Sequence, residues 1–220
     1  MKTIDGKPLP QVIVRVAIAT FVEHGYEKAS MDEVAARAST TKRTVYSHFG
    51  SKDALFRSAL AKAVEMFHSE LPRLEDVSDP EAELSAFALG FSQLSTWKGA
   101  VRLQRVIMSE AERFVDLGAM LHRNVIEKAE ELIADYLRAV ERHRAPKVQQ
   151  RPDEAYVMLA SLFLNMTTAR QRFATLMQAR QPLPDHPLAK TPPDLDVPEI
   201  RHAVAVFLRG AGFAQSDDRT

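Results

Sequence analysis

Three closely spaced helix starts constrain the fold of this chain more than any other feature. Ser30, Thr41 and Ser51 each precede a helical pattern with a hydroxyl side chain, which can accept a hydrogen bond from a backbone amide of the first turn. Each start follows the previous one after about ten residues, so the helices between them are short. The pattern predicts helices over residues 31–37 and 41–48, joined by a three-residue turn, and a longer helix from residue 51.

The charges after these starts are of two kinds. The first helix has Asp32 and Glu33 in its first turn, which suits the positive end of the helix dipole, and Glu33 can complete a capping box. The other two starts are followed by cations, Lys42 and Arg43 in the second helix and Lys52 in the third. An external polyanion would relieve this unfavourable placement, because helix N-terminal amides, the dipole and a cation all favour phosphate. The charge pattern therefore indicates contact with a nucleic acid.

Two short helices joined by a tight turn form a helix-turn-helix, which places its second helix in the major groove of DNA. The stretch from about Val12 to Phe56 resembles the DNA-binding domain of the tetracycline-repressor (TetR) family of bacterial transcription regulators. The most specific part is the run T-V-Y-S-H-F-G-S-K-D-A-L at residues 44–55. The matching residues are Phe21, Gly25, Tyr26, Met31, Val34, Ala35, Thr41, Thr44, Val45, Tyr46, His48, Phe49, Lys52, Leu55 and Phe56.

The chain departs from the family pattern at two positions. The turn has Ser39 where the family usually has Gly, so either Ser39 adopts a left-handed conformation at some strain or the turn is built differently. Arg43 stands where the family often has a small residue. Its long cationic side chain could read a guanine edge or hold a phosphate, and the sequence leaves both open.

The candidates for DNA contact are polar residues at the helix starts or on the second helix. Tyr46 is included because a tyrosine near the end of an exposed short helix is more readily a phosphate contact than a core residue. The full set is Ser30, Thr41, Lys42, Arg43, Thr44, Tyr46, Ser47, His48 and Lys52.

The charge distribution agrees with a DNA-binding N-terminal part. The net formal charge is zero, which does not suit a protein that coats nucleic acid indiscriminately. Residues 1–60 contain nine Lys or Arg and six Asp or Glu, a net charge of +3, and the other 160 residues carry −3. A mildly basic DNA-reading domain joined to an acidic domain would have this distribution.

Other features favour a soluble cytoplasmic protein, associated with the nucleoid when bound to DNA. Cysteine is absent, which excludes disulfides and thiolate metal sites. We expect no signal peptide, because Arg15 interrupts the first apolar run. The longest uncharged apolar run, residues 155–169, is shorter than the roughly 18 residues that a membrane span needs, so no membrane partner is expected.

The rest of the chain has helical periodicity only. An apolar stripe and a stop at Gly25 define the first helix, which starts near Pro10. The helix that begins at residue 51 should end near residue 71. Loops are predicted over residues 145–152 and 181–198, and the second holds six of the 12 prolines. Further helices are predicted over residues 81–97, 99–114, 115–144, 153–177 and 197–210.

The C-terminal part resembles the ligand-sensing domain of the same family more loosely, and residues 105–117 look like a segment found in one branch of it. The helix after Asp153 is apolar all round from Tyr156 to Met166, so both of its sides must be covered. The resemblance implies that this helix and the last one pair with their symmetry mates in a homodimer. The interface candidates are Leu159, Phe163, Phe173, Ile200, Val204 and Phe207.

A pocket for a small molecule is expected in the same domain. Aromatic residues of the core and a few polar groups on apolar helices are its candidates, although buried polar groups are more often satisfied by neighbouring backbone or water. The candidates are Phe91, Trp97, His122, Asn165 and Thr168. No residue stands at convincing ligand spacing with His122, so neither a metal nor a cofactor is expected.

Catalysis is not expected, because Glu110 and Glu112, two residues apart on a helix, face different ways and poorly support acid–base chemistry. The sequence predicts an all-α homodimeric regulator, with a helix-turn-helix domain over residues 1–56 and an effector-binding and dimerisation domain over residues 57–220. It would act as a repressor whose partners are a palindromic double-stranded DNA operator and a small, mainly apolar effector that releases it from the operator. A ligand-blind DNA-binding protein is one alternative. The other, a helical enzyme or lipid carrier, leaves the cations at the helix starts unexplained.

Overall fold

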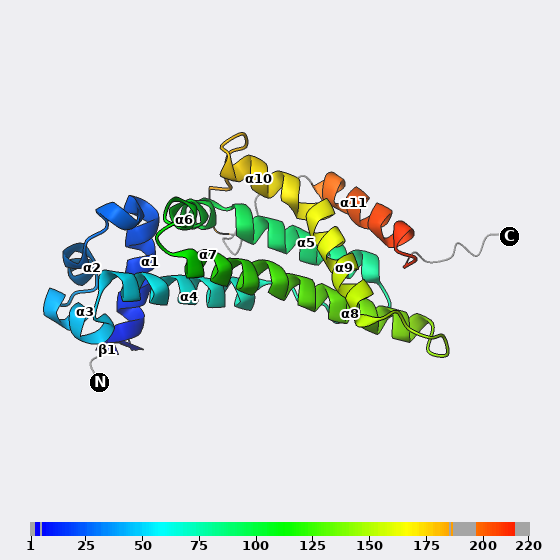
Figure 1. Ribbon diagram of the computed structural model, residues 1–220, viewed down its shortest axis with the longest axis horizontal. Coiled ribbons are helices and arrows are strands. Elements are labelled where there is room, and N and C mark those ends of the chain that lie inside the picture. The colour runs from blue at the N-terminus through cyan, green and yellow to red at the C-terminus, as the bar shows by residue number, and fades with distance from the viewer. Residues whose placement is uncertain (1–2, 5, 185, 187–196, 214–220) are drawn as a thin grey trace. The chain divides into compact units, whose positions relative to one another are not determined.

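The computed structural model describes residues 3–4, 6–184, 186 and 197–213. Its contacts divide the chain into unit 1, residues 1–69 and 102–122, and unit 2, residues 70–101 and 123–220. The described secondary structure is helical apart from one isolated bridge and the two-residue antiparallel strands β1 (Thr3–Ile4) and β2 (Lys7–Pro8) (Figure 1). The all-helical architecture predicted from the sequence is therefore confirmed. The domain boundary placed after residue 56 stays a prediction.

Unit 1 begins with α1 (Leu9–Lys28), whose apolar face is buried at Ile13, Ala17 and Phe21. Gly25 interrupts the helix with φ 76° and ψ 175°, a backbone conformation that residues other than glycine rarely adopt. The chain therefore turns where the sequence predicts the stop, and a last short turn leads to residue 28. The following helices are α2 (Met31–Arg37), α3 (Lys42–Phe49) and α4 (Lys52–Glu70), at the predicted positions (Figure 1).

The segment 102–122 also packs in unit 1, which the sequence did not predict. It holds most of α6 (Lys98–Ser109) and all of α7 (Val115–Leu121). Phe114 precedes α7, and its ring lies 5.1 Å from that of Tyr26 and 5.7 Å from that of Phe56. The guanidinium of Arg113 lies 4.7 Å from the centre of the Tyr26 ring and forms an ion pair of 2.7 Å with Glu27. An aromatic and ionic contact thus joins the α6–α7 connection to the end of α1.

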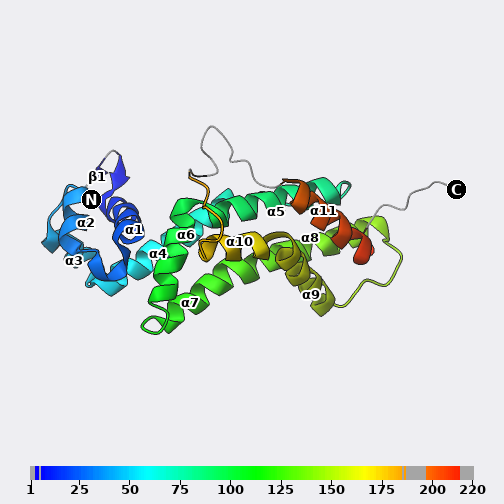
Figure 2. The same ribbon diagram turned by 90° about the horizontal axis from the view of Figure 1, so that it is seen from above.

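Unit 2 consists mainly of α5 (Pro80–Thr96), α8 (Lys128–Arg144), α9 (Asp153–Leu164), α10 (Arg170–Leu176) and α11 (Val197–Gly210) (Figure 2). Its core includes Phe87 and Phe91 of α5 and Leu137 of α8. In α9 and α11, Phe163 and Phe207 are both buried, with ring centres 5.1 Å apart. The loop before α9 is present as predicted, and most of the predicted loop over residues 181–198 lies outside the described residues.

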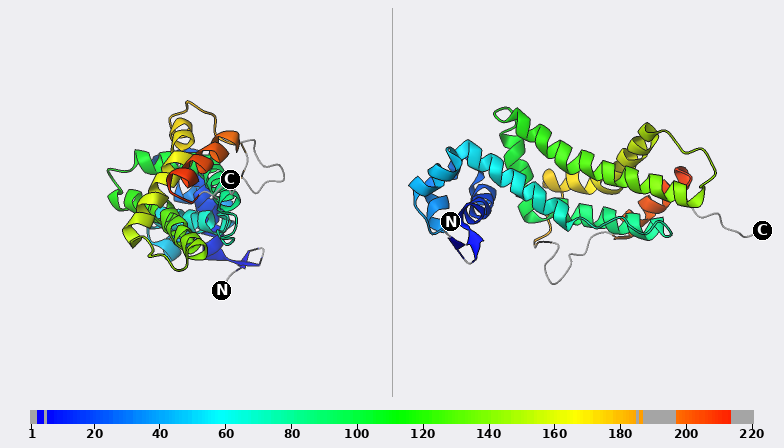
Figure 3. Two further views of the ribbon diagram at one scale, coloured as in Figure 1. Left: turned by 90° about the vertical axis from the view of Figure 1, so that its right-hand side faces the viewer. Right: turned by 90° about the horizontal axis from the view of Figure 1, so that it is seen from below.

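Two π-helical segments divide helices that the sequence predicts as continuous. The segment η1 (His122–Glu127) lies between α7 and α8, and η2 (Asn165–Ala169) lies between α9 and α10 (Figure 3). In η2 the hydroxyls of Thr167 and Thr168 donate to the backbone carbonyls four residues earlier, at 2.8 and 2.7 Å. Such bonds compete with regular helical hydrogen bonding and bend helices. Apolar periodicity carries no signal for these wider turns.

Candidate nucleic-acid interface

The turn between α2 and α3 requires a left-handed residue at Ser39. Its φ is +50°, the first of the two alternatives that the sequence left open. The amide of Thr40 donates to the carbonyl of Ala35 at 2.9 Å, and that of Ser39 donates to the carbonyl of Ala36 at 3.1 Å. These bonds close the end of α2 tightly. α3 therefore starts after a short, fixed connection, as a helix-turn-helix requires.

The start of α3 is satisfied from within the chain. The hydroxyl of Thr41 accepts a hydrogen bond from the amide of Thr44 at 3.2 Å, so Thr41 is the predicted cap. Val45 is buried and fixes the inner face of the helix. On the outer face Tyr46, 41% exposed, is accompanied by the exposed Ser47 and His48. The exposed face of α3 is thus polar and aromatic, with one apolar anchor beneath it.

The cations at this start differ in their surroundings. The ammonium of Lys42 donates to Asp32 of α2 at 2.7 Å, and this hydrogen bond raises the pKa of Lys42 above its ordinary value. Lys42 is therefore compensated within the chain, which the sequence pattern did not indicate. Arg43 is exposed and makes no hydrogen bond or ion pair with any residue that the structure describes. Arg43 is therefore the cation for which the argument from helix electrostatics holds without change.

Lys52 has partners inside unit 1 as well. Its ammonium donates to the backbone carbonyl of Glu27 at 3.0 Å and lies 4.6 Å from the centre of the Tyr26 ring. An ammonium has three donors, so one bond to a carbonyl leaves others for a phosphate. The start of α4 has its own cap, because the hydroxyl of Ser51 accepts from the amide of Ala54 at 3.1 Å.

Ser30 caps α2 as predicted, accepting from the amide of Glu33 at 3.1 Å. The carboxylate of Glu33 does not complete the predicted capping box. It contacts His24 at 2.9 Å and Arg37 at 2.7 Å instead. The Arg37 guanidinium of α2 attracts this carboxylate more strongly than a single neutral amide does.

Known proteins match both parts of the chain. Bacterial regulatory proteins of the tetR family match residues 13–59, and the C-terminal domain of AefR-like transcriptional repressors matches residues 82–210, more than half of the chain. The chain belongs to the TetR family. TetR-family regulators bind DNA and are not enzymes, so the enzyme alternative is excluded.

This TetR-family chain matches two individual relatives over shorter stretches than the two family matches cover together. It is 40% identical over 62 residues to the HTH-type transcriptional repressor SCO4008 of Streptomyces coelicolor, covering 28% of this chain and 32% of that protein. It is 32% identical over 85 residues to the A-factor receptor protein of Streptomyces griseus, covering 38% of this chain and 30% of that protein. The matches thus span about a third of each relative. The solved structure of the flavonoid-responsive regulator FrrA has a TM-score of 0.69 at 24% identity, covering 92% of this chain and 96% of that one.

The predicted pocket residues do not lie together in one described cavity. Phe91 is buried, and Trp97 is partly exposed, with its ring against Gly99 and 4.8 Å from the ring of His186. Thr168 is buried with its hydroxyl bonded to its own helix. Asn165 and His122 are exposed, and the Asn165 amide donates to the carbonyl of Ser161 at 2.9 Å. Their assignment to an effector pocket stays a prediction.

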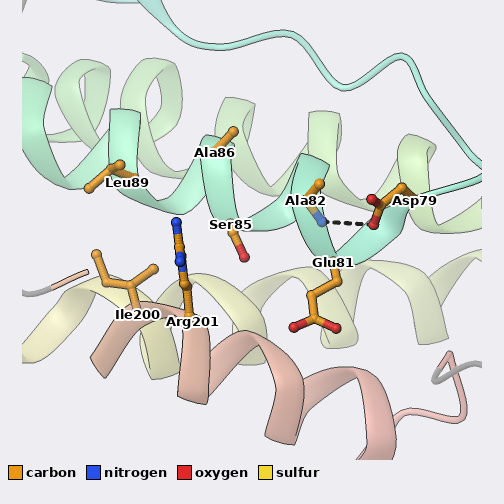
Figure 4. Close-up of a pocket in the computed structure, with 8 residues that line it drawn as sticks. All are labelled: Asp79, Glu81, Ala82, Ser85, Ala86, Leu89, Ile200 and Arg201. Atoms are coloured by element: carbon orange, nitrogen blue, oxygen red, sulfur yellow. Dashed lines mark hydrogen bonds between the residues drawn. The ribbon is translucent and has the colours of Figure 1, made fainter. Parts of the chain in front are cut away.

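A described cavity of about 560 Å³ lies in unit 2 between α5 and α11, and none of the five predicted residues lines it. Figure 4 shows Arg201 of α11 pointing toward α5 beside Ser85, while Glu81 points toward α11. The lining consists of Asp79, Glu81, Ala82, Ser85, Ala86, Leu89, Ile200 and Arg201. The size suits a small molecule, but the charged groups differ from the mainly apolar pocket expected.

The predicted interface residues are mostly part of the chain's own core. Phe163, Ile200, Val204 and Phe207 are 0–4% exposed, so they offer no surface to a partner. Phe173 is 67% exposed. The stripe on α11 packs within unit 2, against α5 and η2, which the sequence pattern could not distinguish from packing against a second copy. Leu159 is partly exposed.

A different set of apolar residues is exposed on α9, η2 and α10. Its members recur at intervals of four and seven residues, which places them on one side of the helices. They are Met158, Leu162, Met166, Phe173 and Met177, which we call the apolar stripe.

Among the described residues, no helix is long and apolar enough to cross a membrane.

Proposed function

We propose that this chain is a homodimeric repressor that binds a roughly palindromic operator in the bacterial cytoplasm and leaves it when a small, mainly apolar molecule binds unit 2. The observation that carries the DNA part is the start of α3. It exposes Arg43 without a described partner, on a helix whose first turn contains no acidic residue. A phosphate would supply the missing negative partner, and a guanine edge would supply two hydrogen-bond acceptors.

Eight of the nine candidate residues, all but Lys52, lie at the starts of α2 and α3 or on α3, and they support this proposal to different degrees. Arg43, Tyr46, Ser47 and His48 are exposed on α3 and can contact DNA without breaking an ion pair within the chain. Lys42 must exchange Asp32 for phosphate, and surface ion pairs of this kind are weak enough to be exchanged. Ser30, Thr41 and Thr44 are engaged in or next to the helix caps. We therefore propose that they contact the DNA phosphate backbone and position the protein, and that they do not read bases.

The apolar stripe supports a homodimer. Soluble monomers rarely expose a row of large apolar side chains, and such a row marks an interaction surface. A two-fold dimer places the same stripe of both copies face to face, and thereby fixes the separation of the two recognition helices. A half-site alone then binds weakly, and the linked pair binds strongly.

The relatives support repression and small-molecule control without fixing the effector. SCO4008 is named as a repressor, and FrrA, which shares the fold, is named for its response to flavonoids. A ligand that prefers a different separation of the two heads lowers operator affinity by its differential binding energy, typically about 1–3 kcal/mol. That ligand must in turn bind less tightly to the DNA-bound protein, by the same factor.

Selection of DNA fragments from a random library tests the DNA part. We expect enrichment of a roughly palindromic sequence whose half-sites lie about one helical turn apart or a multiple of it. Screening of hydrophobic drugs, aromatic compounds and acyl derivatives for operator release then tests the sensing part. Enrichment without any releasing compound would favour the ligand-blind alternative, and no enrichment would contradict the proposal as a whole.

Sedimentation of a Phe173→Glu variant tests the dimer. We expect a dimeric wild type at micromolar concentration and a folded, monomeric variant, because the Phe173 side chain is largely exposed in the single chain. Val148, 65% exposed in the loop before α9, provides the matched control, and Val148→Glu should stay dimeric. A monomeric wild type, or a Phe173→Glu variant that remains a dimer, would contradict the assignment of the stripe.

A further inference from the structure

Arg172 of α10 is a partly buried cation without a described anionic partner. Its Nε is inaccessible to solvent, and Arg172 forms no hydrogen bond or ion pair with any residue that the structure describes. Its guanidinium carbon lies 5.4 Å from the centre of the buried Phe91 ring on α5. Burial lowers the pKa of Arg172, and no nearby carboxylate opposes that effect. The guanidinium is therefore partly removed from water, and no anion of the described chain compensates it.

Arg151, in the same unit, shows how the chain compensates another such cation. One of its guanidinium nitrogens also lacks a hydrogen-bond partner. The other nitrogen, however, donates to the carbonyl of Ala211 at 2.8 Å, and Glu141 forms an ion pair at 3.8 Å. The guanidinium also lies 4.8 Å from the Phe213 ring centre. Arg172 has the aromatic ring but neither the carbonyl nor the carboxylate.

The polar groups around Phe91 are already paired with one another. The hydroxyl of Ser92 donates to the side-chain oxygen of Gln171 at 3.0 Å, and both residues are buried. The hydroxyls of Ser95 and Thr96 donate to the backbone carbonyl of Ser92, at 3.1 and 2.7 Å. Phe91 also faces away from Leu89, which lines the α5–α11 cavity, since positions two apart on a helix point in nearly opposite directions. Arg172 therefore stands at a separate place.

Removing part of the hydration of a charge is costly unless an anion compensates it, and an external anion could do so here. The planar guanidinium fork matches a carboxylate in a bidentate manner, and the Phe91 ring beside it is apolar. We propose that Arg172 binds the anionic group of the effector, and that the effector is an apolar carboxylic acid. This inference rests on the proposed regulation by a small molecule and names its chemical class.

Matched acids and amides test the class, because each pair differs in charge but little in shape. Phenylacetate and octanoate would be compared with phenylacetamide and octanamide, by calorimetry and by the change in melting temperature of the full-length protein. We expect the acids to bind about 10- to 100-fold more tightly than their amides, as a hydrogen-bonded charge pair requires. The difference should vanish in Arg172→Met and be partly kept in Arg172→Lys. Equal affinities in the wild type, or no binding of either acid, would overturn the inference.

Two controls separate this site from general effects. Arg170→Met removes an exposed cation of the same helix that points in nearly the opposite direction and pairs with Glu199 of α11, and it should keep the preference for acids. Ligand-free Arg172→Met should melt no lower than the wild type, since it loses an uncompensated charge. A clearly lower melting temperature would show that water or a second copy already compensates Arg172, which contradicts the inference. Operator binding of the ligand-free wild type and variants is measured in parallel. A wild type that does not bind any operator would contradict the proposed function and not this inference.

Discussion

Replacing Arg43 by alanine should affect stability and DNA binding in opposite directions. Arg43 is the second residue of α3, its side chain is exposed, and no described residue pairs with it. Removing a cation from the first turn relieves an unfavourable dipole interaction of about 0.3–1 kcal/mol, and alanine is an equally good or better helix former. For a chain of this size each kcal/mol shifts the melting temperature by about 2–4 °C. The variant should therefore melt about 1–4 °C higher than the wild type.

Operator affinity of the same variant should fall, by about 5- to 150-fold if Arg43 reads a base edge. A fluorescently labelled operator measures the affinity, and calorimetry measures the stability. Arg15→Ala is the matched control, because it removes the same charge from an exposed position in the middle of α1 and should leave operator preference unchanged. A lower melting temperature with unchanged operator affinity would refute the reasoning, since Arg43 would then have a structural role.

Two further variants test the geometry of the helix-turn-helix. Asp32→Asn frees Lys42 from its ion pair and should strengthen operator binding, at most about fivefold, an effect that titration should no longer detect when Lys42 is also replaced by alanine. Ser39→Gly relieves the left-handed strain and should stabilise the protein by up to about 1 kcal/mol in thermal unfolding, whereas Ala36→Gly, in the regular helix α2, should destabilise it by about the same amount. A lower melting temperature for Ser39→Gly would show that the serine side chain contributes more than the strain costs.

The sequence predicted the helices of this protein well where caps and turn residues mark them. The hydroxyls of Ser30, Thr41 and Ser51 lie at the starts of α2, α3 and α4, and each accepts the expected backbone hydrogen bond. Gly25 interrupts the first helix where the sequence predicts the stop, and Ser39 has the positive φ of one of the two alternatives that the sequence leaves open. These signals are local, because each depends only on the residue and its next few neighbours. The polar outer face of α3 follows from the same local pattern.

Contacts between distant segments were not predictable in this way. The pairing of Lys42 with Asp32 depends on the angle between two helices, and the contact of Arg113 with Glu27 joins segments 86 residues apart. Apolar periodicity shows that a helix face is covered but not what covers it. For this reason the sequence pattern predicts that Val204 and Phe207 face a partner chain, although unit 2 buries them itself. Only the exposed fraction of each side chain, which a single sequence does not contain, separates the apolar stripe of α9, η2 and α10 from such buried faces.

A salt titration of DNA binding tests the central claim most directly. The dissociation constant would be measured for the selected operator and for a scrambled duplex of the same composition, between about 50 and 200 mM salt. A dimer that makes six to ten phosphate contacts should lose about 10³- to 10⁵-fold in affinity over this range. At any one salt concentration it should prefer the operator by about 10³-fold or more. Affinity that does not change with salt, or equal affinity for the two duplexes, would contradict the account.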